Sequence, residues 1–454
     1  MKRPQHIAIV GAGLVGCMLA TLLARRGHMV SVFEKREESA TLTNSTGRST
    51  HLAISARGWR AIEAIDAGPE VLRSALPLKG RRIHSANGME QIFQPYGDDE
   101  QAIFAIHRNV LNRILARICA STAGVTMHFS HQCMHVDASG GVLELTNSLT
   151  GEGLTVQADY IFAADGAFSK VRERATGSTR IRSAVQFESF GYKEVTIPVA
   201  TAASLEPDAM HAWPRGEVSL FAFPNPDRTF TATLLAPFKG PNGFTNICTA
   251  EDVERVFAQR FPDVAAGQLC AELLANPVNS LVTVRCTPWT IDGRLALLGD
   301  AAHAMVPFLG QGMNAGFEDC MAITEMLDQH DEDFRAVLSR YEQLRKPHCD
   351  AVTTMSANTF DELTKQVASA HFHLKKQLER TIHRLYPERF VPPYELIAFT
   401  HVPYAEVQRR IEQLDNIAEE LVRRIGPQGM QDENTVEHHI QTYITELTGD
   451  ACEA

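Results

Sequence analysis

The sequence lacks several features that mark whole classes of protein. Its nine cysteines are scattered over 454 residues, and none stands in a Cys-x-x-Cys pair. A disulfide framework is therefore not indicated, and we expect reduced thiols in a cytoplasm. A basic block is missing too, because 43 Lys and Arg are outnumbered by 54 Asp and Glu and the net charge is −11. Such an acidic chain is a poor candidate for binding nucleic acid.

Long hydrophobic runs are also scarce. Residues 7–24 carry no charge and follow Lys2 and Arg3, a pattern like that of a secretory signal. The spacing of the glycines in this run favours a different interpretation, and no small-residue cleavage site follows it. No other segment approaches the roughly 18 apolar residues of a membrane span. We therefore expect a soluble, cytoplasmic protein without a membrane anchor.

The composition that remains is that of a globular protein, with 44% hydrophobic and 21% charged residues. It excludes the disordered, collagenous and low-complexity classes. Short apolar runs at 6–10 and 29–33 flank a helix-like segment at 14–26, which is the pattern of a βαβ unit. The chain therefore begins with an α/β domain.

The turn of this unit carries the spacing Gly-x-Gly-x-x-Gly. Gly11 permits the tight turn, Gly13 lets a pyrophosphate approach the backbone, and Gly16 allows the helix to pack closely on the strand. Glu34, at the end of the second apolar run, can accept a hydrogen bond from a ribose hydroxyl. Together these residues predict a dinucleotide site, but they do not distinguish FAD from NAD.

Two later motifs set an aspartate beside a glycine. Asp165 lies in Ala-Asp-Gly-Ala-Phe-Ser, followed by Arg172, and Asp300 lies in Leu-Gly-Asp-Ala-Ala-His. Each motif alone indicates no more than a turn with a capping aspartate. In this order behind the glycine motif, they resemble the Asp-Gly and Gly-Asp motifs of the single-component FAD-dependent aromatic hydroxylase family. The resemblance implies FAD as the cofactor, with Asp300 holding its ribitol chain.

The resemblance implies further contacts to FAD. Arg108 matches a family arginine that contacts the cofactor, and the glycines of 307–314 open a helix whose backbone N–H groups can reach the isoalloxazine ring. The predicted cofactor-binding residues are Gly11, Gly13, Gly16, Glu34, Arg48, Arg108, Asp165, Asp300, Gly310, Gly312, Met313 and Asn314.

In this family the flavin carries the chemistry. The resemblance implies that NADPH or NADH binds transiently and reduces tightly bound FAD. The reduced flavin then reacts with O2 to form a hydroperoxide that attacks an electron-rich ring. No catalytic acid, base or metal ion is required by such chemistry, and we predict none.

The pattern of the chain divides it into three parts. Segments alternate as in β-strands over much of 176–285, a strand of the buried type follows at 295–298, and the chain beyond about 315 is helical. We predict an α/β protein with a Rossmann-like FAD-binding domain, a β-sheet substrate-binding domain and a C-terminal helical region. Their predicted boundaries are 1–75, 100–175 and 286–350 for the first, 76–99 and 176–285 for the second, and 351–454 for the third.

Across almost its whole length the sequence is similar to the kynurenine 3-monooxygenase family. The matching segments are 47–49, 80–81, 94–97, 192–194, 213–214, 223–225, 307–308 and 390–394. In that family an arginine and two tyrosines clamp the amino-acid carboxylate of kynurenine, and they fall on Arg81, Tyr96 and Tyr394. A guanidinium and two phenols suit one carboxylate, at about 1.5–3 kcal/mol for each charge-assisted hydrogen bond.

The expected pocket departs from the family at its aromatic end. Leu309 stands in place of a histidine and Leu235 in place of a phenylalanine, whereas Glu362 is kept. Thr359 and Leu363 replace an asparagine and a methionine. The predicted substrate-binding residues are Arg81, Tyr96, Tyr394, Phe308, Leu309, Leu235, Thr359, Glu362 and Leu363.

We predict that the substrate is L-kynurenine or a close ring-substituted analogue. It would be hydroxylated at the 3-position, ortho to the ring amine, in tryptophan catabolism or a derived pathway. Two alternatives stay open because the flavin motifs do not choose a substrate. They are an FAD-dependent hydroxylase of another aromatic carboxylic acid and a non-catalytic flavin-binding protein.

Two further observations concern tryptophan and the C-terminal part. Flavin halogenases need a Trp-x-Trp-x-Ile-Pro run, and they are excluded because the only tryptophans are Trp59, Trp213 and Trp289. Residues 405–454 carry charges throughout, so the hydrophobic anchor of mitochondrial relatives is not expected here. The C-terminal helices are predicted to cover the substrate pocket or to form a dimer surface, in a monomer or homodimer.

Overall fold

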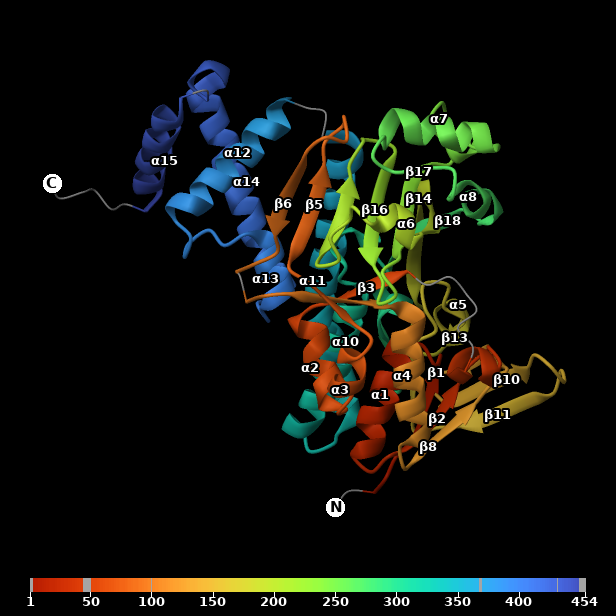
Figure 1. Cartoon of the computed structure of the whole chain (residues 1–454). Coiled ribbons are helices and arrows are strands. Elements are labelled where there is room, and N and C mark those ends of the chain that lie inside the picture. Colours follow the sequence, from red (N-terminus) through yellow and green to blue (C-terminus); the bar gives the residue numbers. More distant parts are fainter. Residues whose placement is uncertain (1–2, 44–49, 99, 367–369, 431, 449–454) are drawn as a thin grey trace.

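The structure, a computed structural model, describes residues 3–43, 50–98, 100–366, 370–430 and 432–448 (Figure 1). Its first sheet has six strands in the order β19-β20-β12-β1-β2-β8. They are β1 (His6–Val10), β2 (Met29–Phe33), β8 (Val125–His128), β12 (Tyr160–Ala163), β19 (Thr290–Ile291) and β20 (Leu295–Leu297). All pair in parallel except β19, an antiparallel edge strand.

Helices cover this sheet because its strands are apolar on both faces. In β1, for example, Ile7, Ala8 and Ile9 are completely buried. The helices of this domain are α1 (Leu14–Arg25), α2 (Ala56–Ala64), α3 (Gly68–Leu72), α4 (Arg108–Ser121), α5 (Lys170–Arg174), α9 (Asp300–His303) and α10 (Gly312–Gln329). Since α1 begins directly behind β1, the glycine turn lies at the carboxyl edge of the parallel strands, where open α/β sheets bind nucleotides.

Two smaller sheets are attached to this domain. A four-stranded sheet consists of β9 (His131–Asp137), β10 (Val142–Asn147), β11 (Gly153–Gln157) and β13 (Ala175–Thr176). A three-stranded sheet consists of β3 (His51–Ile54), β4 (Leu76–Leu78) and β7 (Ile103–His107). Both β3 and β4 pair antiparallel with β7, which leads directly into α4.

The second large sheet has seven strands in the order β18-β14-β17-β16-β15-β5-β6. They are β5 (Gly80–His84), β6 (Gln91–Pro95), β14 (Arg182–Ile197), β15 (Ala209–Trp213), β16 (Ser219–Pro224), β17 (Phe230–Pro237) and β18 (Asn279–Thr287). The hairpin of β5 and β6 joins the sheet through parallel pairing of β5 with β15. A short helix, α6 (Val199–Ala202), connects β14 to β15.

The two faces of this sheet have different partners. Trp213 and Leu234 lie on the face that packs against α7 (Ala250–Arg260) and α8 (Cys270–Ala275). Side chains alternate between the faces of a sheet, so Arg81, Phe223 and Leu235 belong to the opposite face. That face carries the candidate substrate site.

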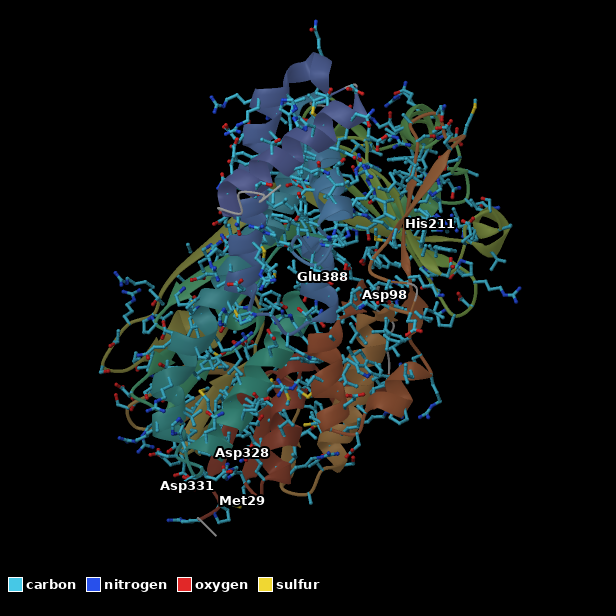
Figure 2. All side chains as sticks on the ribbon, turned by 90° about the vertical axis from the view of Figure 1, so that its left-hand side faces the viewer. Met29, Asp98, His211, Asp328, Asp331 and Glu388 are labelled. Carbon is cyan, nitrogen blue, oxygen red and sulfur yellow. The ribbon has the colours of Figure 1, made fainter. Side chains whose placement is uncertain are left out.

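The C-terminal helices are α11 (Phe334–Asp361), α12 (Ala370–Leu385), α13 (Pro393–Phe399), α14 (Tyr404–Gly429) and α15 (Glu433–Thr448). Helices α12, α14 and α15 share an apolar core and form the blue group at the upper left of Figure 1. In the view turned by 90°, Met29 and Asp331 mark the far end of the first domain, and His211 lies in the second large sheet (Figure 2). Within the described chain, no helix has both the length and the apolar character needed to cross a bilayer.

Candidate functional site

The turn between β1 and α1 needs glycine at two of its three motif positions. Gly11 has a φ of +103°, and a Cβ there would lie 2.5 Å from the carbonyl oxygen of Ala164. A Cβ on Gly16 would lie 1.9 Å from the carbonyl oxygen of Gly11. A Cβ on Gly13 would instead meet no atom within 4 Å, and no side chain caps α1 here. The turn thus leaves space beside the N–H groups of the first helical turn, as a phosphate requires.

Glu34 directly follows β2 and is buried against this turn. Its Oε2 accepts a hydrogen bond from the backbone N–H of Ala12 at 2.8 Å, and its Oε1 accepts one from Nε of Arg36 at 2.8 Å. Burial opposes ionisation, but the hydrogen bonds and the charge of Arg36 lower the pKa of Glu34. The carboxylate is therefore anionic at neutral pH and holds the turn in place. Arg36 is not among the predicted residues, and its only signal in the sequence is a basic residue two positions after Glu34.

Asp165 follows β12 and caps α5. Its Oδ2 accepts hydrogen bonds from the backbone N–H groups of Lys170 at 2.7 Å and Val171 at 3.2 Å. Its Oδ1 is buried without a hydrogen-bond partner among the described residues, and burial raises the pKa of the carboxyl group. One oxygen of Asp165 thus orders the loop and the other is left without a donor.

Arg172 joins the loops of the two aspartate motifs. Its Nη1 donates to the carbonyl oxygen of Ala301 at 2.6 Å, and its Nη2 donates to that of Ala167 at 2.6 Å. Because Ala301 directly follows Asp300, the two motifs meet in the structure although about 130 residues separate them in the sequence.

Asp300 begins α9 after Gly299, whose φ is +54°. Its side chain is half-buried, and within the described part of the chain no group donates a hydrogen bond to it. Its Oδ1 lies 3.9 Å from the point that a Cβ on Gly312 would occupy. A carboxylate with free acceptor sites therefore faces the start of α10, and it suits the hydroxyl groups of a ribitol chain.

The segment that leads into α10 is a tight turn, and the side chain of Asn314 stabilises it by hydrogen bonds. Gly310 adopts the left-handed conformation with a φ of +65°. Nδ2 of Asn314 donates to the carbonyl oxygens of Ala53 and Gly310, both at 2.8 Å, and its Oδ1 accepts from the N–H of Ser55 at 3.1 Å. Met313 and Asn314 are buried, so Asn314 supports the turn with its side chain, and the backbone at Gly310 and Gly312 is what the turn can offer to a ligand.

The structure brings the three predicted clamp residues together. Arg81 lies on β5, Tyr96 follows β6, and Tyr394 lies on α13, with the two tyrosine rings 4.7 Å apart. Burial raises the pKa of Tyr96 to about 12, against the opposing charge of Arg81. Burial and the neighbouring Tyr96 raise the pKa of Tyr394 as well. Two neutral phenols and an exposed guanidinium thus converge, a set of donors that suits one carboxylate.

Beyond the clamp, apolar side chains form a second cluster on the same face of the sheet. Leu235 and Phe308, two of the predicted substrate-binding residues, belong to it, and the rings of Phe308 and Phe360 stack 4.9 Å apart. Phe190 meets Phe360 edge to face at 5.3 Å. Phe190 and Phe360 are not among the predicted residues. Phe360 stands between Thr359 and Glu362 in a segment that the sequence does single out, so its neighbours were a signal for it.

The other predicted pocket residues lie at the border of this cluster or outside it. Leu309 packs with Val352 and Leu396 in a different apolar cluster, beneath the C-terminal helices. Thr359 Oγ1 donates to the carbonyl oxygen of Met355 within its own helix at 3.0 Å. The remaining two, Glu362 and Leu363, belong to a π-helical turn after α11, where burial raises the pKa of Glu362 and Lys376 lies 3.7 Å from its carboxylate.

Two predicted arginines stand apart from the rest. Arg48 lies outside the described residues. Arg108 begins α4 with an exposed side chain, and its backbone N–H donates to the carbonyl oxygen of Thr50 at 3.0 Å. Arg108 is thereby fixed at the junction of the three-stranded sheet with α4.

One buried group resembles a cation site. His303, Asp319 and Cys349 offer ligand atoms within 4.8 Å of one another. However, Nε of Arg345 donates to Oδ1 of Asp319 at 2.9 Å, and Nε2 of His303 lies 2.6 Å from Oδ2 of the same carboxylate. Burial opposes ionisation, but His303 and Arg345 lower the pKa of Asp319 to about 2. The carboxylate is already neutralised by protein groups, so the group is an ion-pair network.

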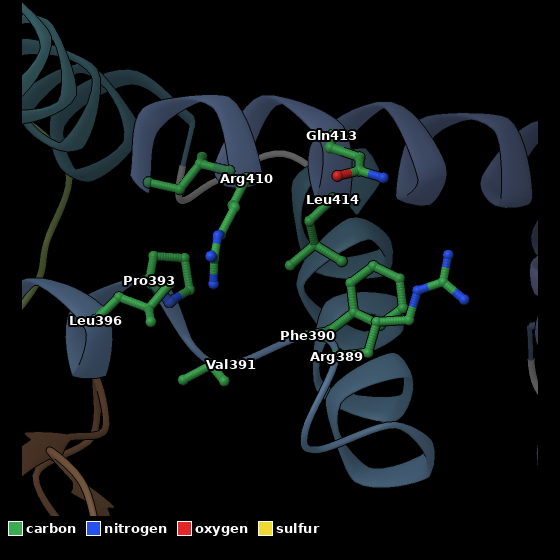
Figure 3. A pocket seen from close by; sticks show the side chains of 9 residues that line it. Arg389, Phe390, Val391, Pro393, Leu396, Arg410, Gln413 and Leu414 are labelled. Carbon is green, nitrogen blue, oxygen red and sulfur yellow. The ribbon is translucent and has the colours of Figure 1, made fainter. Parts of the chain in front are cut away.

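A cavity of about 50 Å³ lies between α14 and residues 389–396, which include the start of α13. Figure 3 shows its lining, which includes Arg389, Val391 and Arg410. This volume holds a few water molecules but not an aromatic amino acid. None of the three clamp residues lines it, so it is separate from the candidate substrate site.

The chain is similar to known proteins over most of its length. Residues 5–356 match the family described as FAD binding domain. Kynurenine 3-monooxygenase of Flavobacterium psychrophilum is 37% identical over 444 residues, which cover 97% of this chain and 98% of the relative. The enzyme of that name from Myxococcus xanthus is 38% identical over 424 residues, 92% of this chain and 91% of the relative.

Solved structures share the fold at lower identity. The tetrameric form of 2-methyl-3-hydroxypyridine-5-carboxylic acid oxygenase has a TM-score of 0.66 at 20% identity, covering 87% of this chain and 96% of that chain. PqsL of Pseudomonas aeruginosa, a probable FAD-dependent monooxygenase, has a TM-score of 0.64 at 20% identity, with 80% and 97% covered. These similarities confirm the predicted α/β fold class with an FAD-binding domain.

Proposed function

The chain belongs to the kynurenine 3-monooxygenase family of FAD-dependent aromatic monooxygenases, and we propose that it hydroxylates L-kynurenine, or a close ring-substituted analogue, at the 3-position. The observation that carries the proposal is the convergence of Arg81, Tyr96 and Tyr394 from three separate elements. The substrate of the relatives carries an amino-acid carboxylate at one end and an aromatic ring at the other, and the site has a polar and an apolar end to match.

The clamp would bind the carboxylate of the substrate. Arg81 contributes a permanent positive charge, since a guanidinium does not lose its proton in proteins. Tyr96 and Tyr394 keep their phenolic protons at neutral pH and donate them as hydrogen bonds. The aromatic ring would then extend toward Leu235 and Phe308.

The residues of the first domain fit FAD. The space over Gly13 and the N–H groups at the start of α1 suit the pyrophosphate. Asp300 offers free acceptor sites for ribitol hydroxyls, and the backbone around Gly310 would face the flavin ring. When bound, FAD supplies the redox chemistry: NADPH or NADH gives two electrons, one atom of O2 enters the ring and the other leaves as water.

The protein groups around the ring would bind, orient and exclude water. Leu235, Phe308 and Phe360 form an apolar wall that keeps the reacting end dry. The positive end of α10 favours negative charge that develops on a group bound before it. No side-chain acid or base is assigned a step.

The deciding experiment is turnover by the purified, FAD-loaded protein. L-Kynurenine should stimulate oxidation of NADPH or NADH, and mass analysis should show a product with one added oxygen atom. p-Hydroxybenzoate, whose carboxylate is attached directly to the ring without an amino-acid group, should neither stimulate nucleotide oxidation nor gain oxygen. If p-hydroxybenzoate is oxygenated instead, the protein is a hydroxylase of another aromatic acid. If no aromatic acid stimulates the oxidation of NADPH or NADH, the proposed activity is wrong.

The cell compartment and the oligomeric state stay predictions, namely a cytoplasmic monomer or homodimer. The free state of the eight cysteines in the described chain supports a reducing compartment. Gel filtration of the FAD-loaded protein would decide between monomer and homodimer.

A further inference from the structure

Buried charges connect the loop of the second aspartate motif to α2. The backbone N–H of Gly299 donates to Oδ2 of Asp319 at 3.1 Å. On the other side of this carboxylate, Nη2 of Arg345 donates to Oε2 of Glu318 at 3.2 Å. Oε1 of Glu318 in turn accepts from Nη1 of Arg57 at 2.6 Å. The connection thus runs from α9 through α10 and α11 to α2, and Arg57 at its end is 1% exposed.

Arg57 also holds the segment that follows the clamp helix. Its guanidinium donates to the carbonyl oxygens of Ile397 and Val402 and lies 4.1 Å from the centre of the Tyr404 ring. Ile397 belongs to α13, the helix that carries Tyr394. A single side chain of the first domain therefore fixes both ends of the connection between α13 and α14.

A second link returns from this segment to the turn before α10. The hydroxyl of Tyr404 donates to Oε1 of Gln311 at 2.8 Å, and both side chains are fully buried. Gln311 stands between Gly310 and Gly312, the two glycines whose backbone is open to a ligand. The turn that fits the flavin and the helix that carries Tyr394 are thus connected through two buried residues.

Burying such a network of charges costs free energy of desolvation. Buried ion pairs lose hydration, and well-packed apolar side chains of similar size often stabilise a fold as well or better. The network here joins the two ends of the active site, and every link in it is directional. Coupling between sites requires an element that both sites bias, and segment 393–404 touches both.

We propose that Arg57, Glu318 and Tyr404 are positioning residues that couple occupancy of the flavin site to the order of segment 393–404. FAD binding at the turn would hold Gln311, and through Tyr404 and Arg57 it would hold α13 in the position that completes the clamp. The role of Tyr394 in the clamp rests on the proposed function, whereas the coupling itself needs no substrate.

The test compares amide hydrogen exchange of the apoprotein and the FAD-saturated protein, without substrate. In the wild type, FAD should slow exchange of peptides from 393–404 by roughly 5- to 150-fold, the usual range of coupling between sites. In Tyr404→Phe, which keeps the ring under Arg57 but loses the hydroxyl, this protection should fall to about 1-fold. Peptides from α7, remote from the network, report intact folding.

The control variant is Tyr443→Phe. Tyr443 on α15 also lies under an arginine, with Arg424 4.4 Å from its ring, but Arg424 ends in a surface ion pair with Glu446. This variant should keep the protection of the wild type. If Tyr404→Phe does not retain FAD, Glu318→Gln carries the same expectation, because it removes the charge that holds Arg57.

Two outcomes would overturn the proposal. One is a wild type in which FAD leaves exchange at 393–404 unchanged, and the other is full protection in Tyr404→Phe or Glu318→Gln. Turnover separates this from the proposed function. If L-kynurenine gives no product with the wild type, the substrate assignment fails, and the exchange measurement still decides the coupling.

Discussion

The surroundings of single side chains set the charge that each of them carries. Arg36 keeps the buried Glu34 anionic, whereas burial keeps Tyr96 and Tyr394 protonated. The clamp therefore combines a guanidinium with two phenols, and burial keeps the pKa of both phenols above the neutral range. Binding of a carboxylate should then be governed by the ionisation of the ligand alone between about pH 6 and pH 9.

Replacing Arg81 by alanine should weaken substrate binding and leave the cofactor in place. Losing one charge-assisted interaction of about 1.5–3 kcal/mol corresponds to a rise in the KM for L-kynurenine of roughly 10- to 160-fold. The neighbouring residue supplies the control, because Arg82 alternates to the other face of β5 and lies 3.2 Å from Glu206. Arg82→Ala should leave KM within about twofold. An unchanged KM in Arg81→Ala would show that the carboxylate binds elsewhere.

Replacing Asp300 by alanine should cost affinity for FAD. Its carboxylate has free acceptor sites in the described structure, so the folded protein loses little without it, but the ribitol hydroxyls would lose a charged acceptor. We expect the Kd of FAD, followed by flavin fluorescence, to rise about 10- to 100-fold. Asp66→Asn, a change at an exposed ion pair, is the matched control. Equal affinity in Asp300→Ala and Asp66→Asn would refute the assignment.

At the element scale, each strand serves two neighbours. On β5, Arg81 faces the clamp while His84 faces α7 and lies 2.6 Å from Asp263 through its Nδ1. The same carboxylate oxygen accepts from Nε1 of Trp213 at 2.8 Å. Hydrogen bonds thus fix the face of the sheet that packs against α7. The opposite face can present Arg81 from a rigid strand.

The glycine turn separates folding from binding within one element. A methyl group on Gly16 would collide with the backbone at Gly11, whereas one on Gly13 would enter open space. Gly16→Ala should therefore lower the free energy of unfolding by about 1–3 kcal/mol in urea titration. Gly13→Ala should fold normally and fail to bind FAD, because its methyl group takes the place of the pyrophosphate. If both variants lose stability equally, the assignment of the space over Gly13 to the pyrophosphate is wrong.

At the scale of the whole molecule, the site depends on contacts between distant parts of the chain. Arg81 and Tyr394 are more than 300 positions apart, yet both lie near Tyr96. The buried ion pairs of Asp319 fix α9, α10 and α11 relative to one another. Protonation of Asp319 in acid should therefore weaken both the fold and the position of the loop that carries Asp300.

Acid should weaken the fold through Asp319. Its pKa in the folded protein, about 2, lies below the ordinary value of 3.8, so its ion pairs stabilise the fold above about pH 4. This contribution, roughly 2 kcal/mol, is lost as the pH falls from about 4 to 2. His303 acts oppositely, since its raised pKa adds stability below 6.5 that is lost in alkali.

Melting temperatures measured across this acid range give the check. The wild type should lose stability more steeply between about pH 4 and pH 2 than Asp319→Asn, which starts lower at neutral pH and has one carboxylate fewer to protonate. Parallel curves for the two proteins would show that Asp319 does not contribute to the acid response.

The shape of the glycine turn and the family could be predicted because both depend on local spacing. Glycines at fixed distances produce the same turn wherever a strand leads into a helix, so Gly11 and Gly16 could be assigned a role from sequence alone. The same holds for the helical C-terminal part, whose pattern repeats over long segments. Residues that match a motif in order also predicted that Tyr96 and Tyr394 belong together, and the structure places them in contact.

Contacts between side chains that share no motif could not be predicted and became evident from the packing of the elements. Arg36 reaches Glu34, Phe190 meets Phe360, and Leu309 turns toward the C-terminal helices, away from the cluster around Leu235. These contacts depend on how separate elements pack, and their partners in the sequence carry no common spacing. The contact of the Arg57 guanidinium with the Tyr404 ring is of the same kind, since the two residues meet only when α2 packs against the start of α14.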